Sequence, residues 1–150
     1  VTGYAPERFM GRGLLLNIAD VQAMPLVTAE VIEAQLGGLV GDGAIVICRN
    51  SDPASLAGER PLPSLTPESA EWIAARHSKM VGIDTHFRLG VDVPHGRRLH
   101  DILMSADVTL VEFLANLEQL NRPEFYFMAL PYLCRTIDSG WARAVAIVEK

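Results

Sequence analysis

Short apolar runs alternate with segments that carry helix signals over the first two thirds of the sequence. The runs at 13–19, 44–49 and 80–84 are each bounded by glycine, aspartate or other polar residues, which is typical of buried strands. Between them, residues 28–38 begin at a capping threonine and end at two glycines, and residues 66–77 begin with Thr66 and Pro67. This alternation predicts an α/β domain.

The last third of the sequence has a different order of elements. Residues 97–106 predict a short helix, and residues 108–114, 125–130 and 142–148 predict strands. No helix separates the last two strands, so part of the sheet should be antiparallel. The 150 residues therefore predict one α/β domain, with a mixed β-sheet flanked by helices and irregular connections at 50–65 and 86–96.

Composition and charge exclude several classes of protein. Hydrophobic residues make up 49% and charged residues 21% of the chain, which predicts a folded core and not a disordered segment. A net charge of -5 argues against nucleic acid or an anionic membrane as a partner. We find no apolar run long enough to cross a bilayer and no secretory leader, and expect a cytoplasmic protein. Cys48 and Cys134 lie in strand-like runs and are expected to be reduced core thiols.

Two residues in the stretch 97–120 are the main candidates for chemistry. Alternation along 108–114 places Glu112 on one face with three apolar residues, Val108, Leu110 and Leu114. A carboxylate on such a face needs a partner or a metal ion, unless it reaches solvent at the strand end. His100 lies on the apolar side of the expected helix, where a histidine is either a core or capping residue or a metal ligand.

Further candidate ligands precede this helix. His86, His95, Asp84 and Asp92 lie within thirty residues of Glu112, and such a set suits a hard or borderline divalent metal. Their spacing matches no compact signature such as His-Glu-x-x-His. The sequence also has no glycine-rich phosphate loop and no Gly-x-Ser-x-Gly nucleophile motif.

The order of these segments resembles the second half of the cyclase-like metal-dependent hydrolases, a family that includes bacterial kynurenine formamidase and isatin hydrolase. The similar pieces run from residue 7 to residue 149 and include "GRGLLLNI", "GDGAIVICRN" and "LTPESAEWIAARHSKMVGIDT". The most specific piece is His100 with Glu112 twelve positions later, followed by Ala-Asn-Leu. The resemblance implies a domain of the swivelling β/β/α type.

The resemblance also implies roles for individual residues. In the family, a histidine and a glutamate at this spacing reach the metal centre. His100 is therefore expected to ligate or flank a zinc or manganese ion and to act in catalysis, and Glu112 to be a metal carboxylate. His86, Phe87 and Asn116 are expected to contact the substrate, although the family commonly has small or apolar residues and a serine where His86 and Phe87 stand.

The family's main metal motif, His-x-Gly-Thr-His-x-Asp-x-Pro-x-His, does not occur in the sequence. Three hypotheses follow from this departure. The chain is an incomplete metal-dependent hydrolase of small amides or lactams, a family member that binds small molecules without catalysis, or a subunit that a partner chain completes. We expect a small-molecule ligand, no nucleic-acid or membrane partner, and a homo-oligomer, dimer or tetramer, because a chain of this kind would expose sheet edges.

Overall fold

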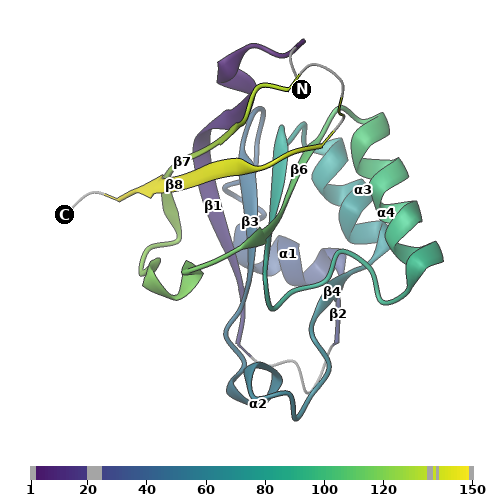
Figure 1. Cartoon of the computed structure of the whole chain (residues 1–150). Helices are drawn as coiled ribbons and strands as arrows, with labels where there is room; N and C mark the ends of the chain where they lie inside the picture. Colours follow the sequence, from purple (N-terminus) through teal and green to yellow (C-terminus); the bar gives the residue numbers. More distant parts are fainter. Residues whose placement is uncertain (1–2, 20–24, 135–136, 138, 149–150) are drawn as a thin grey trace.

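The computed structural model describes residues 3–19, 25–134, 137 and 139–148 of the chain. The main strands are β1 (Met10–Ile18), β3 (Ile45–Asn50), β5 (Met80–Asp84), β6 (Thr109–Leu114), β7 (Glu124–Pro131) and β8 (Ala142–Ile147). They form one curled sheet in the order β6–β5–β3–β1–β7–β8 (Figure 1). The first four strands are parallel and β7 and β8 are antiparallel additions, so the predicted mixed sheet is confirmed.

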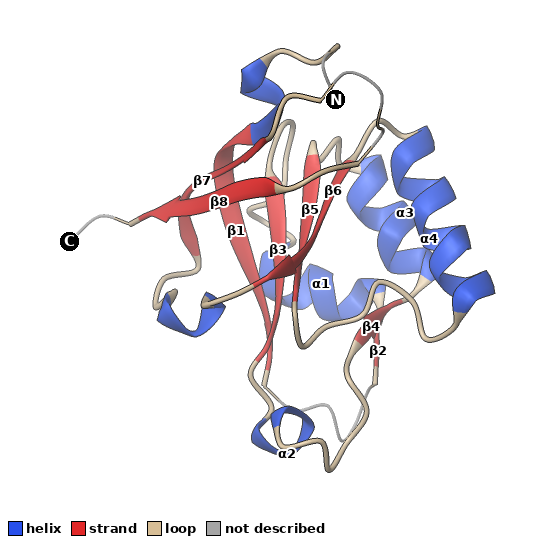
Figure 2. Ribbon diagram, viewed as in Figure 1, coloured by secondary structure: helices blue, strands red, loops and turns tan. Residues whose placement is uncertain are grey.

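Three helices connect the parallel strands: α1 (Ala29–Leu36), α3 (Pro67–Ala75) and α4 (Val93–Ser105). Their buried residues share one core with the strands, and this core contains Leu14, Leu16, Ile32, Val46, Cys48, Ile73, Val81, Leu99 and Leu103. The helices therefore cover one face of the sheet, as the separation of helices and strands in Figure 2 illustrates. None of the helices in the described part of the chain is long and apolar enough to cross a membrane.

β7 and β8 curl over the opposite face of the sheet, so the side chains on that face pack against one another. This second core contains Ile45, Ile47, Met80, Leu114, Phe125, Phe127 and Ala129. Each fully buried leucine, isoleucine or phenylalanine contributes about 1.5–3 kcal/mol relative to exposure, so both faces stabilise the domain. Strands buried on both faces account for the continuous apolar runs in the sequence.

The connections contain more regular structure than the sequence predicts. Residues 50–65 hold the short helix α2 (Pro53–Leu56) and strand β4 (Ser64–Leu65), which pairs with β2 (Leu26–Val27). Two short 3-10 helices, η1 (Pro6–Phe9) and η2 (Leu117–Gln119), precede β1 and β7.

Helix α4 begins four residues earlier than predicted. The Asp92 side chain accepts a hydrogen bond from the backbone N–H of His95, and Pro94 stands in the first turn. Both features are N-terminal helix signals, so the interpretation of residues 86–96 as wholly irregular is wrong. By contrast, the Thr66 cap of α3 is confirmed, with Ser69 completing a reciprocal capping box.

The two cysteines lie in different environments. Cys48 is fully buried in β3, and this burial raises the pKa of its thiol to about 12. Cys134 follows the end of β7 and is partly exposed. The prediction of a core thiol is therefore confirmed for Cys48 and wrong for Cys134, because the strand ends at Pro131.

Candidate metal centre

Helix α4 and strand β6 bring the two main candidate residues together. The Nε2 atom of His100 lies 3.9 Å from the Oε2 atom of Glu112. Each side chain is a little over one third exposed, so the pair stands at the rim of the core and not inside it. On α4, the fully buried Leu99 and Leu103 fix the rotation of the helix against the sheet, and thereby the position of His100.

The ring of His100 is oriented by its own helix. Its Nδ1–H donates to the carbonyl oxygen of Gly96 at 2.8 Å, one turn earlier. In the neutral ring, this bond selects the tautomer in which Nε2 carries the free lone pair. The lone pair is thus on the nitrogen that faces Glu112. A metal-ligating histidine usually has this arrangement, with the other ring nitrogen donating to a carbonyl or carboxylate.

A β-bulge in β6 adjoins Glu112. Between β5 and β6, Gly82 pairs with Val111 while Asp84 pairs with Leu114, so β6 contains one extra residue. The extra residue moves Leu114 to the opposite core, away from the helices. The prediction that Glu112 and Leu114 share a face is therefore wrong, whereas Leu110 and Val108 do lie in the helix-side core.

Phe113 occupies the bulge in a conformation that L-residues seldom adopt. Its φ is +60° and its side chain is 79% exposed. A bulky residue in this left-handed region costs about 1–2 kcal/mol, and burial of the ring does not offset that cost. Such strained residues cluster at ligand sites, and this one adjoins Glu112.

We expect Phe113→Asn to raise the free energy of unfolding by about 0.5–1 kcal/mol, because asparagine tolerates positive φ. Phe113→Ala is the matched control: it removes the ring but keeps a Cβ without a polar group that could stabilise this backbone. Urea denaturation monitored by circular dichroism measures both variants. Equal stability of the two variants would show that the backbone at this position is not strained.

A shallow depression, wide open to solvent, runs along α4 beside His100. One face of the helix lines it, with Val93, Gly96, Arg97, His100, Asp101, Met104 and Ser105. Arg97 and Asp101 form an exposed pair one turn apart, at 3.3 Å. The candidate centre is therefore open to a small molecule from the side of α4.

The other predicted ligands do not join the His100–Glu112 pair. His95 Nδ1 accepts a hydrogen bond from the backbone N–H of Val91 at 3.2 Å. The Nδ1 atom of His86 lies 3.6 Å from Asp84, whose carboxylate also accepts backbone N–H groups of Asn50 and His86. Among the described residues, no group of three or more His, Cys, Asp or Glu side chains is placed to hold a metal ion.

The three predicted substrate contacts lie in different places. Phe87 is buried in the helix-side core, and His86 is exposed beside it. Asn116 is exposed at the start of η2 with a φ of +63°. None of the three lines the depression along α4, and their role in substrate binding stays a prediction.

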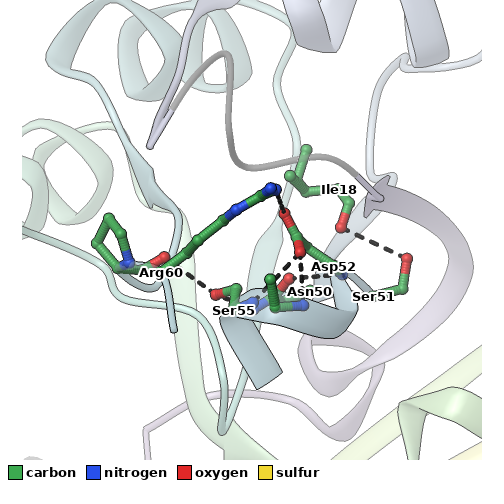
Figure 3. Close-up of polar contacts among 8 residues, drawn as sticks. Ile18, Asn50, Ser51, Asp52, Ser55 and Arg60 are labelled. Carbon is green, nitrogen blue, oxygen red and sulfur yellow. Dashed lines mark hydrogen bonds and ion pairs between the residues drawn. The ribbon is translucent and has the colours of Figure 1, made fainter. Parts of the chain in front are cut away.

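A buried polar network follows β3, and the sequence reading did not identify it. Asp52 is 2% exposed, accepts the backbone N–H groups of Ala54 and Ser55, and pairs with Arg60 at 3.1 Å. Asn50 donates to the Ser55 hydroxyl at 2.9 Å and accepts the N–H of Asp52 (Figure 3). The Asp52–Pro53 pair is a helix-start signal that could have revealed α2.

Solved structures share this fold. One is described as a potential metal-dependent hydrolase with cyclase activity, with a TM-score of 0.74 and 22% identity over 95% of this chain and 67% of that one. A predicted metal-dependent hydrolase from Bacillus stearothermophilus has a TM-score of 0.72 and 20% identity, over 93% and 64%. An isatin hydrolase bound to thioisatinate has a TM-score of 0.76 and 22% identity, over 97% and 63%. The chain thus spans about two thirds of the length of these proteins.

The sequence comparison identifies the family independently of the fold. No curated protein sequence matches the chain. The family model described as "Putative cyclase" matches residues 1–88, which end before His100 and Glu112. This match covers more than half of the 150 residues and agrees with the resemblance noted in the sequence. The chain belongs to the putative cyclase family.

Proposed function

We propose that the chain contributes His100 and Glu112 to a divalent metal centre of a hydrolase that cleaves the C–N bond of small amides or lactams. One observation carries the proposal: His100 Nε2, with its lone pair free, faces the Glu112 carboxylate at 3.9 Å. At that distance the two groups form no hydrogen bond, so the facing lone pair and anion are available to a third group.

The donor set suits zinc or manganese. Imidazole nitrogen and carboxylate oxygen are ligands of both ions. His100, through Nε2, and Glu112, through its carboxylate, would hold such an ion. The Gly96 carbonyl supplies the outer hydrogen bond that keeps the imidazole basic and correctly turned.

In the proposed reaction, each of these residues has its own role. When bound, the metal supplies Lewis acidity at the substrate carbonyl and acidifies the attacking water. Glu112 provides negative charge that retains the cation. His100 holds its Nε2 lone pair at the centre, either as a ligand or as a base that takes a proton from water. The depression along α4 admits the substrate, and His86, Phe87 and Asn116 are proposed substrate contacts.

Catalytic zinc sites usually have three protein ligands. In this proposal at least one further ligand joins His100 and Glu112 from residues beyond the described pair or from another chain. A homo-oligomer in the cytoplasm is the setting we propose. The isatin hydrolase of similar fold was solved with an analogue of its product. Lactams such as isatin are therefore the first substrate class to assay.

A second candidate function is small-molecule binding without hydrolysis. It is favoured by the absence of a third metal ligand beside the pair among the residues that the structure describes. The two functions differ in metal binding, which only the hydrolase requires.

Calorimetric titration of the chelator-stripped chain with Zn²⁺ and Mn²⁺ tests the proposed hydrolase. We expect Glu112→Gln to weaken binding at least about tenfold, because it removes the anionic ligand and keeps the shape. Glu118→Gln is the matched control, since Glu118 is exposed on η2, six residues further along. Equal binding by Glu112→Gln and the wild-type chain would refute this site, and absent binding by the wild-type chain would refute a metal centre that this chain forms alone.

A further inference from the structure

Two neighbouring arginines on α4 point in different directions. Successive residues of a helix lie about 100° apart around its axis, so Arg97 and Arg98 cannot share a face. The pKa of Glu68, at the start of the adjacent helix α3 (Figure 1), is lowered by hydrogen bonds from its own backbone N–H and from the Thr66 hydroxyl, and by the charge of Arg98. Arg97 instead lines the depression beside His100, and Arg98 does not. The charge of Arg97 therefore needs an explanation of its own.

The guanidinium of Arg97 is largely unused by the protein. Its one hydrogen bond to the described residues runs from Nε to a carboxylate oxygen of Asp101 at 3.3 Å. The two side chains are 79% and 64% exposed, so solvent weakens the pair. In the described part of the chain, neither terminal nitrogen of Arg97 has a hydrogen-bond partner. The planar fork that matches a carboxylate is therefore open.

The stability of α4 does not explain a cation at this position. Helices favour acidic residues in their first turn, yet α4 has none there after its cap, Asp92, and carries Arg97 and Arg98 in the next turn. The order of the Arg97–Asp101 pair is also the less favourable one, because an acidic residue four positions before a basic one stabilises a helix better than the reverse. A ligand explains the open guanidinium better than the helix does.

Arg97 lies next to the candidate metal ligand on the same face of the helix. Residues three apart on a helix are neighbours, with about 5–6 Å between their Cβ atoms, and the bond to Asp101 turns the Arg97 side chain toward the level of His100. Val93 and Met104 line the same depression and are 85% and 63% exposed. An open cation, a candidate metal ligand and exposed apolar side chains thus border one depression, which suits a small organic anion.

The depression also lies in a basic part of an acidic chain. The net charge of the chain is -5, but residues 86–100 contain three arginines, three histidines and a single acidic residue, Asp92. The Asp92 carboxylate is engaged as the N-cap of α4. A local excess of positive charge attracts anionic ligands to a site. The charge around the depression therefore favours a substrate with an acidic group.

We propose that Arg97 binds an acidic group of the substrate, so that the site selects small amides or lactams that carry a carboxylate. The inference rests on the proposed hydrolase for the reaction at His100 and Glu112, whereas the binding of a carboxylate by Arg97 requires no metal. The carboxylate lies about one helical turn from the carbonyl that is cleaved. A neutral lactam occupies the same depression without using Arg97 and binds more weakly.

Ligand-observed NMR titration of the full chain in EDTA, with isatin and isatin-5-carboxylate, tests the proposal. The two lactams differ by one carboxylate. We expect the wild-type chain to bind the carboxylate about threefold to tenfold more tightly than isatin, and Arg97→Gln to bind both equally. Arg98→Gln is the matched control, since it removes the same charge from the adjacent residue and should keep the preference. Asp101→Asn should increase the preference, because Arg97 loses a competing carboxylate.

The outcomes separate this proposal from the proposed hydrolase. A wild-type chain that binds the carboxylate no better than isatin, or an equal loss of preference in Arg97→Gln and Arg98→Gln, overturns the role of Arg97. EDTA keeps metal out of the titration, so failure of the hydrolase leaves these ratios unchanged. Where the zinc-loaded chain hydrolyses both lactams, Arg97→Gln should raise KM for isatin-5-carboxylate and leave kcat and the KM for isatin unchanged. Hydrolysis without that change in KM also overturns the proposal.

Discussion

Gly90→Ala is expected to lower the free energy of unfolding by about 3 kcal/mol. A Cβ atom at position 90 would lie 2.3 Å from the backbone nitrogen of Gly96 and 2.4 Å from its Cα. Backbone atoms cannot rotate away as a side chain can, so the first turn of α4 must move. Chemical denaturation in urea, with the slope of the transition compared between variants, measures the effect.

Gly96→Ala tests the same contact from the opposite side and should have the opposite sign. A Cβ at position 96 meets only Gly90 Cα at 3.9 Å, an ordinary contact. Alanine in a helix is favoured over glycine by about 0.5–1 kcal/mol, so this variant should be more stable than the wild-type chain. Metal binding should weaken in Gly90→Ala only, since movement of the first turn displaces the carbonyl that orients His100. Equal effects of the two substitutions would contradict this account of the contact.

The sequence predicts the order of the main elements because their signals are local. Thr66 and Pro67 mark the start of α3, and the runs in β3 and β5 are apolar on both faces. The sequence does not predict the start of α4 at Val93, because the histidines and glycines around Asp92 have the composition of a loop. Curling of β7 and β8 over one face depends on contacts between distant residues, and no local pattern encodes it.

The meeting of His100 and Glu112 was expected from the family resemblance, and elementary geometry agrees with it. From His100 to the end of α4 at Ser105 the chain rises about 7.5 Å, and from Thr109 to Glu112 the returning strand covers about 10 Å. A tight turn at Ala106 and Asp107 therefore brings both residues to one level. The bulge at Phe113 could not be predicted, because it shows only in the pairing of β6 with β5.

Asp52→Ala is expected to cost about 2–3 kcal/mol of stability. The carboxylate is almost fully buried, caps α2 through two backbone N–H groups and pairs with Arg60. Removing it leaves those donors unsatisfied where water has little access. The cost stays below that of a fully buried pair, because the Arg60 side chain is 32% exposed and can turn to solvent.

Asp52→Asn separates the cap from the charge. Asparagine caps helices as well as aspartate does, so this variant should keep the bonds to Ala54 and Ser55 and lose only the ionic attraction to Arg60. We expect its stability in urea denaturation to fall between those of the wild-type chain and Asp52→Ala. If Asp52→Ala were within about 0.5 kcal/mol of wild type, the network would lack the structural role assigned to it. If Asp52→Asn were as unstable as Asp52→Ala, the ion pair and not the cap would hold the segment after β3 in place.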